Sequence, residues 1–254
     1  MHYFQSEPNL FCVDKPVGWT PLQALEELRR REQVSTDTPL TYAGRLDPMA
    51  EGLLLVLAGT RVHEKDAFLK LDKQYRVTAL LGITTDSYDL LGLPSIPPGQ
   101  SWSILNNSEQ SLSRILASFV GTTTLPLPAF SSPPVQGKPL FWWKRNTPNG
   151  IESPLRTTRI HAITDVQTDT LSAHELSLYI HDVIPSVQGD FRQTEIITQW
   201  DTLLQNQQFT TASFTVHSES GTYIRSLVHE LGKRLGTGAC VYTLRRTAVG
   251  PYTL

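Results

Sequence analysis

The chain has 254 residues, 39% of them hydrophobic and 18% charged, a globular balance that excludes a disordered tail and a fibrous protein. Its net charge of −2 gives no basic excess of the kind that nucleic-acid binders usually carry. Two distant cysteines, Cys12 and Cys240, exclude a disulfide framework, and no apolar run approaches the roughly 20 residues needed to span a bilayer. The start of the chain lacks the layout of a signal peptide. We therefore expect a soluble cytoplasmic protein.

The first third of the chain predicts strands and one well-marked helix. An apolar run over residues 10–13 predicts a short strand, which a turn follows. Thr20, Pro21 and Gln23 are the residue types of an N-cap, a first helical position and a capping-box partner, so we expect a helix over 21–31. A continuous apolar run over 53–57 predicts a buried strand, and alternating apolar residues over 75–83 predict a half-buried one.

The rest of the chain mixes helical and strand-like patterns. Prolines predict a loop over 93–99, and apolar residues at helical spacing predict a helix over 112–119. Six prolines between residues 121 and 150 predict a segment that leaves the core sheet. Alternation predicts strands around 176–180 and 214–216, and a last helix runs over 224–235 before two glycines. Strands and helices do not alternate regularly, so we expect an α+β fold.

The residues show no cofactor or metal motif. The histidines are scattered, and the chain has no Walker loop, no GxGxxG and no GxSxG, so we expect neither a cofactor nor a metal. The unusual stretch is YAGRLDPMAEGL at 42–53, where Asp47 lies between a glycine-containing turn and a buried strand. A carboxylate could be held rigidly there. The alternative is an ordinary Asp-Pro turn with no chemical role.

Five blocks of the sequence, taken in order, resemble the motifs of the TruB family of tRNA pseudouridine synthases. They are DKPVGWT at 14–20, GRLDPMAEG at 44–52, KQY at 73–75 with GITTDSYD at 82–89, GTYIRSL at 221–227, and GA at 238–239 with LRRT at 244–247. The blocks extend from about residue 10 to residue 250. The resemblance implies a cofactor-free isomerase that converts a uridine in the T-loop arm of tRNA to pseudouridine.

The resemblance also implies the architecture. It predicts a pseudouridine synthase fold, with a mixed, largely antiparallel sheet and flanking helices, as a single catalytic domain over 1–254. The segment 121–150 resembles a mobile family element that folds over the RNA. It is acid-free, basic and aromatic, as a flap-like RNA-binding insertion should be. A surface loop with a small core of its own is the alternative.

Three residues are expected to carry the chemistry. Asp47 matches the family's nucleophile, and Arg225 matches the arginine that pairs with it and would keep it charged. Tyr75 matches the tyrosine that stacks on the flipped base and assists proton removal from its C5. The alternatives are a solvated helix charge for Arg225 and ordinary core packing for Tyr75.

Five further residues are expected to contact the substrate. We expect Lys15 to shape the site or touch the backbone, and Leu244 to border the base pocket unless it is ordinary packing. Tyr42 stands where the family usually has a histidine tied to displacing the target base; tyrosine keeps the aromatic face but cannot become cationic. Gly44 and the flap residue Arg145 complete this set.

The family resemblance leaves two alternatives open. The RLD at 45–47 also resembles the RluA and RsuA synthases, which act on ribosomal RNA, although Pro48 and the distal blocks favour the tRNA branch. A non-catalytic tRNA-binding or folding protein is the other alternative. The chain ends soon after LRRT, so we expect no C-terminal PUA domain, and binding to tRNA that depends steeply on salt. We expect a monomer.

Overall fold

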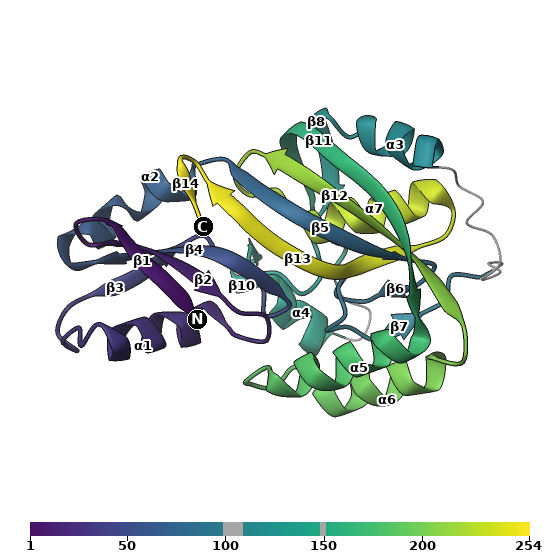
Figure 1. Ribbon diagram of the computed structural model, residues 1–254, viewed down its shortest axis with the longest axis horizontal. Helices are drawn as coiled ribbons and strands as arrows, with labels where there is room; N and C mark the ends of the chain where they lie inside the picture. Colours follow the sequence, from purple (N-terminus) through teal and green to yellow (C-terminus); the bar gives the residue numbers. More distant parts are fainter. Residues whose placement is uncertain (99–108, 148–150) are drawn as a thin grey trace.

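The computed structural model describes residues 1–98, 109–147 and 151–254, and its centre is one large twisted sheet (Figure 1). Eight strands form the main path, in the spatial order β1 (His2–Glu7), β2 (Leu10–Lys15), β4 (Ala50–Ala58), β13 (Ala239–Val249), β5 (Lys73–Leu81), β12 (Gln208–Ser218), β11 (Leu155–Ser172) and β8 (Gly121–Pro126). Strand β13 runs parallel to β4, and the other neighbours on this path are antiparallel. The predicted mixed, largely antiparallel α+β fold is confirmed.

Helices cover the two faces of the sheet unequally. One face packs against α1 (Pro21–Arg31), α3 (Glu109–Ala117) and α7 (Ile224–Leu235), through a core that includes Leu28, Leu116, Phe214 and Leu227. The other face packs at one end against α5 (Ala173–Val183) and α6 (Gln193–Leu203), which lie side by side at the bottom of Figure 1. Among the described helices, none has the length and apolarity that crossing a membrane requires.

Short elements complete the fold at its edges. Strand β3 (Leu40–Ala43) pairs with β4, and β14 (Tyr252–Thr253) pairs with β13. A two-residue strand β6 (Thr84–Thr85) pairs with β7 (Pro94–Ser95), so the predicted loop over 93–99 contains a short strand, and its residue 99 lies outside the described residues. Helix α2 (Lys65–Leu69) follows a 3-10 turn over Gly59–Glu64.

Helix α1 shows how far local sequence determined the structure. It spans the predicted residues, the hydroxyl of Thr20 accepts from the backbone N–H of Gln23, and the Gln23 side chain accepts from the N–H of Thr20. Pro21 occupies the first helical position, where its missing N–H costs nothing. Helix α7 is confirmed as well, and it ends at Gly236 in the left-handed conformation, φ 72°.

The prediction of a strand around 176–180 is wrong, because these residues belong to helix α5. Leu176, Ile180 and Val183 are buried at helical spacing, whereas Leu178 points to solvent. The alternation over three residues was too short to tell the two periods apart. The decisive signal is the capping box in which Ser172 and Glu175 cap each other's backbone N–H groups.

The proline-rich segment also differs from its prediction in part. Its first six residues form β8, which pairs with β11 at the edge of the main sheet, so this part does not leave the sheet. An edge strand tolerates proline, and Pro126 is its last residue. The rest is a separate excursion that holds the hairpin β9 (Pro134–Val135) and β10 (Lys138–Pro139) and helix α4 (Leu140–Asn146). Residues 148–150 of the predicted insertion lie outside the described residues.

Candidate active site

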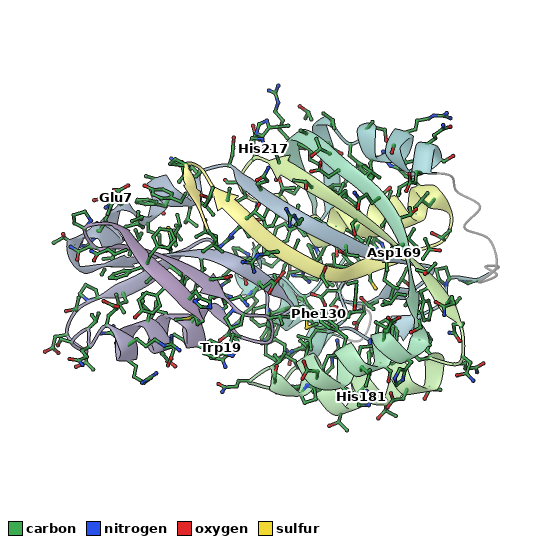
Figure 2. The ribbon with its side chains drawn as sticks, in the orientation of Figure 1. Glu7, Trp19, Phe130, Asp169, His181 and His217 are labelled. Carbon is green, nitrogen blue, oxygen red and sulfur yellow. The ribbon has the colours of Figure 1, made fainter. Side chains whose placement is uncertain are left out.

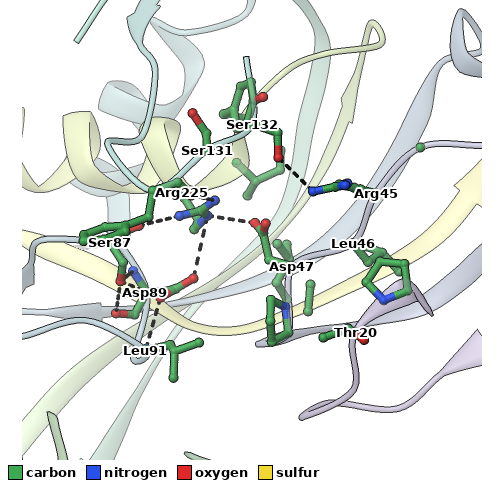
Figure 3. A pocket seen from close by; sticks show the side chains of 18 of the residues that line it. Thr20, Arg45, Leu46, Asp47, Ser87, Asp89, Leu91, Ser131, Ser132 and Arg225 are labelled. Carbon is green, nitrogen blue, oxygen red and sulfur yellow. Dashed lines mark hydrogen bonds and ion pairs between the residues drawn. The ribbon is translucent and has the colours of Figure 1, made fainter. Parts of the chain in front are cut away.

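Asp47 and Arg225 meet although 178 positions separate them in the sequence. Asp47 lies in the loop between β3 and β4, and Arg225 is in the first turn of α7. The Arg225 Nε atom is 2.8 Å from Asp47 Oδ2 (Figure 3). The Arg225 side chain is 5% exposed and that of Asp47 is 39% exposed. The carboxylate therefore lies at the surface of the pocket, and its cationic partner lies behind it.

Asp89 is a second carboxylate on the same guanidinium, and the sequence reasoning assigned it no role. Its Oδ2 is 3.7 Å from Arg225 Nε, and its Oδ1 accepts from the Ser87 hydroxyl at 2.6 Å and the Leu91 N–H at 3.0 Å. The Ser87 carbonyl accepts from Arg225 Nη1 at 2.7 Å. The signal available in the sequence was the last residue of the GITTDSYD block. These bonds fix the direction in which Arg225 points.

Burial and charge oppose each other at this cluster. Burial alone would lower the pKa of Arg225, but the carboxylates of Asp47 and Asp89 outweigh it and raise that pKa. Burial raises the pKa of Asp89, and the charge of Arg225 opposes this shift. A guanidinium that stays cationic favours the ionised form of the carboxylate beside it. The geometry therefore presents the partly solvated carboxylate of Asp47, with a cation directly behind it, to whatever enters the pocket.

A pocket of about 910 Å³ surrounds this pair. That volume is in the range of natural ligand sites. Seven of the eight residues predicted for the site line it: Tyr42, Gly44, Asp47, Tyr75, Arg145, Arg225 and Leu244. The fold therefore assembles in one place residues that come from three strands, one loop and two helices.

Tyr75 and Leu244 form part of the apolar wall. Tyr75 is on β5, and Leu244 is on the neighbouring strand β13. Both side chains are buried and belong to the core under α1 and α7. They also line the pocket, so each of them has a packing role and a pocket contact. Such a wall can hold the flat face of a base.

Lys15 is the predicted contact residue that does not line the pocket. Its side chain is fully buried, and its Nζ donates to the carbonyls of Pro16 at 2.8 Å and Trp19 at 2.7 Å. Burial lowers its pKa to about 7, against the opposing charge of Asp47. Lys15 thus holds the turn before α1, in agreement with the expectation that it shapes the site. The expected substrate contact stays a prediction.

Arg246 fixes the loop that carries Asp47, and the sequence reasoning missed its role. Its Nε donates to the Leu53 carbonyl at 2.7 Å, and its Nη2 donates to the Gly44 carbonyl at 3.0 Å. Gly44 has a φ of +84°, and a Cβ at Gly52 would lie 2.3 Å from the Arg246 carbonyl. The signal was the strand period, because adjacent arginines on β13 point to opposite faces and so lie in different surroundings.

Tyr42 has a cation close to its ring. It lies on β3, and the Lys65 Nζ atom is 5.8 Å from the ring centroid. This distance is within the range of a cation–π contact. The tyrosine itself cannot carry positive charge, but the structure places a lysine beside its ring.

The excursion over 127–147 contacts the catalytic loops. The carbonyl of Phe130 accepts from Arg225 Nη2 at 3.2 Å, and the hydroxyl of Ser132 accepts from Arg45 Nη1 at 2.9 Å. The guanidinium of Arg192 lies 4.6 Å from the centroid of the Phe130 ring and forms two hydrogen bonds with Asp86. The base of the excursion is therefore tied to the residues that hold Asp47.

Comparison with known proteins identifies the family of the chain. The model for the N-terminal domain of TruB family pseudouridylate synthases matches residues 33–182, and that for the tRNA pseudouridylate synthase B C-terminal domain matches 225–254. The tRNA pseudouridine synthases B of Blochmanniella pennsylvanica and Tolumonas auensis are each 31% identical to the chain over 96% of its length. The chain covers 75% of the first and 60% of the second.

The structural comparison agrees in fold. The crystal structure of a Cbf5-Nop10-Gar1 complex contains a chain with a TM-score of 0.55 and 20% identity. The match covers 96% of the chain and 49% of that protein. The sequence matches along nearly its entire length show that the chain belongs to the TruB family of pseudouridylate synthases.

Proposed function

We propose that the chain isomerises a uridine in the T-loop arm of tRNA to pseudouridine, with Asp47 as its nucleophile. Family membership and relatives named tRNA pseudouridine synthase B support the reaction and the tRNA substrate. The observation that carries the role of Asp47 is its position, exposed to the pocket with its carboxylate 2.8 Å from a buried arginine.

The proposed reaction balances without a cofactor. The bond between N1 of uracil and C1′ of ribose breaks, the base turns, and C1′ joins C5 instead. The proton leaves C5, and N1 takes up a proton, so substrate and product are isomers. An ionised carboxylate can stabilise the detached pieces by a covalent bond, which divides one difficult step into two easier ones. Arg225 supplies the positive charge beside that carboxylate, 2.8 Å away.

Tyr75 is proposed to receive the base. A uridine inside folded RNA must first leave its stack, which costs a few kcal/mol. Stacking on an aromatic side chain returns roughly 1–3 kcal/mol. Tyr75, with Leu244 on the adjacent strand, offers such a surface beside Asp47, and its phenol is the candidate for assisting proton removal from C5.

The excursion from the sheet is proposed to act as a flap, and the chain is proposed to act as one domain. The excursion from residue 127 onward, with Arg145 on α4 lining the pocket, would close over the RNA. All proposed site residues come from one chain, so a single catalytic domain acting as a monomer suffices. Cys12 and Cys240 are buried and unpaired, which agrees with the reducing cytoplasm that holds tRNA.

Tritium release from a tRNA transcript that contains 5-tritiated uridine tests the proposal. We expect release by the wild type, none by Asp47→Asn, and none when the T-loop uridine is replaced by cytidine. Release from ribosomal RNA but not from tRNA would instead support the ribosomal alternative. Binding of tRNA without release by either protein would support the folding-protein alternative.

A further inference from the structure

Two histidines and an aspartate meet at the junction of β5, β12 and β11, away from the pocket. His161 is on β11, His217 is on β12, and Asp72 directly precedes β5. One ligand atom from each lies within 4.8 Å of the other two. The His161 and His217 rings have their centroids 4.8 Å apart, and His161 Nε2 is 3.1 Å from Asp72 Oδ2. These positions span 145 residues, so spacing along the chain does not reveal them.

The local backbone brings the two histidines to the same spot. In the pairing of β11 with β12, Ile160 lies opposite Ser218 and Ala162 lies opposite His217, and the register shifts between them at His161. This irregularity adds one residue on β11 and redirects its side chain. His161 is the extra residue, between the pairs Ile160–Ser218 and Ala162–His217, and it therefore lies next to His217.

The imidazole of His161 directs its Nε2 atom at a carboxylate. This nitrogen is shielded from solvent and lies 3.1 Å from Asp72 Oδ2, at ion-pair distance but outside hydrogen-bond geometry. Neutral imidazole nitrogen and carboxylate oxygen are ligands that zinc and similar transition metals accept.

We propose that Asp72, His161 and His217 form a binding site for a zinc-class divalent cation. The two imidazoles and the carboxylate would supply three ligands and leave a fourth position for water. Ligands of a tetrahedral zinc ion lie about 3.3 Å apart, so the side chains must approach each other from the present limit of 4.8 Å. His217 is exposed and Asp72 is 44% exposed, so both have room to rotate.

The site is separate from the proposed active site. None of its three residues lines the pocket. His217 is paired with Gln74, whereas the adjacent pair joins Val216 and Tyr75, so His217 points to the sheet face opposite Tyr75. In Figure 2, His217 lies near the top of the view, away from the pocket residue Phe130. The ion would join three neighbouring segments of the sheet rather than take part in catalysis.

Isothermal titration of the untagged protein with zinc chloride tests this site. We expect one zinc ion per chain, and at least about tenfold weaker binding by His217→Ala and by Asp72→Asn, since loss of an outer partner alone costs 10–100-fold. His181→Ala is the matched control, because His181 faces Asp201 at 3.4 Å on α5 and α6 without a second histidine. Its affinity should equal that of the wild type. Cys12 and Cys240 are buried and do not compete in the folded protein.

Two further measurements separate a metal site from a simple ion pair. Zinc should raise the thermal midpoint of the wild type and of His181→Ala but not of His217→Ala, and cobalt should give a visible d–d absorption that only His217→Ala and Asp72→Asn lose. Absence of zinc binding, or equal binding by His217→Ala and wild type, would overturn the proposal and leave a His–Asp ion pair only.

Discussion

The floor and the rim of the pocket differ in how their cations are placed: the floor has a buried, paired arginine, and the rim has exposed cations. On the floor, Arg225 is buried on α7 and faces the carboxylates of Asp47 and Asp89. On the rim, Arg145 of helix α4 lines the pocket and is exposed. Lys138 and Lys144 are exposed on the same hairpin and helix, in a stretch without an acidic residue. A buried charge that loses its partner destabilises the fold. An exposed charge stays hydrated without a partner and is available to bind a phosphate of the RNA. Changes on the floor should therefore affect turnover and stability, and changes on the rim should affect RNA affinity.

The largest effect is expected for Asp47→Asn. Loss of the nucleophile should lower turnover by at least about a thousandfold, as for other catalytic side chains. Asp47 is 39% exposed, and Arg225 retains Asp89, so the free energy of unfolding should change by about 1 kcal/mol or less. Tritium release and urea denaturation measure the two quantities. A variant that loses most of its stability would show that Asp47 holds the fold and not only the reaction.

Arg225→Met should damage both properties. It leaves Asp89 buried without a cation, which is expected to cost about 3–5 kcal/mol in the free energy of unfolding. The double variant Arg225→Met with Asp89→Asn removes the stranded charge, so it should recover most of the stability but none of the turnover. Chemical denaturation of the two variants beside tritium release separates these roles. Equal stability of the single and double variants would contradict the burial argument.

On the rim, Arg145→Ala should weaken tRNA binding without destabilising the fold. One lost phosphate contact reduces the slope of log affinity against log salt by about 0.7–0.9. Lys233→Ala, which removes an exposed charge at the far end of α7, is the charge-matched control and should leave the slope unchanged. Fluorescence anisotropy at several salt concentrations gives both slopes. Identical slopes for the two variants would argue against a flap that grips RNA.

The smallest effect concerns the pH dependence of stability. Burial lowers the pKa of Lys15 to about 7, below its value in the unfolded chain, so between about pH 7 and 10 the unfolded state binds more protons. Stability should therefore rise with pH in this window, by up to about 1.4 kcal/mol per unit for this group. Lys15→Met should lack this part of the slope, which denaturation at pH 7, 8 and 9 would measure. An unchanged slope would mean that Lys15 stays charged in the folded protein.

Sequence patterns predicted the elements whose signals are local. The capping box of α1, the C-terminal Gly236 of α7 and the apolar run of β4 each specify their element within a few residues. The strand expected around 176–180 failed because three alternating apolar residues fit a helix equally well. The edge strand β8 was missed because the six prolines over 121–150 suggested a segment outside the sheet, whereas only pairing with β11 could reveal a strand there.

Local sequence and family motifs were enough to name Asp47, Tyr75 and Arg225, because motif residues can be read without knowing their distances. Only the folded chain placed Asp89 behind Arg225, turned Arg246 toward the loop of Asp47, and joined Asp72 to His161 and His217. Each of these contacts depends on strand register or on the crossing of α7 over the sheet. A shift of one residue in register moves a side chain to the opposite face, and no spacing along the chain reports it.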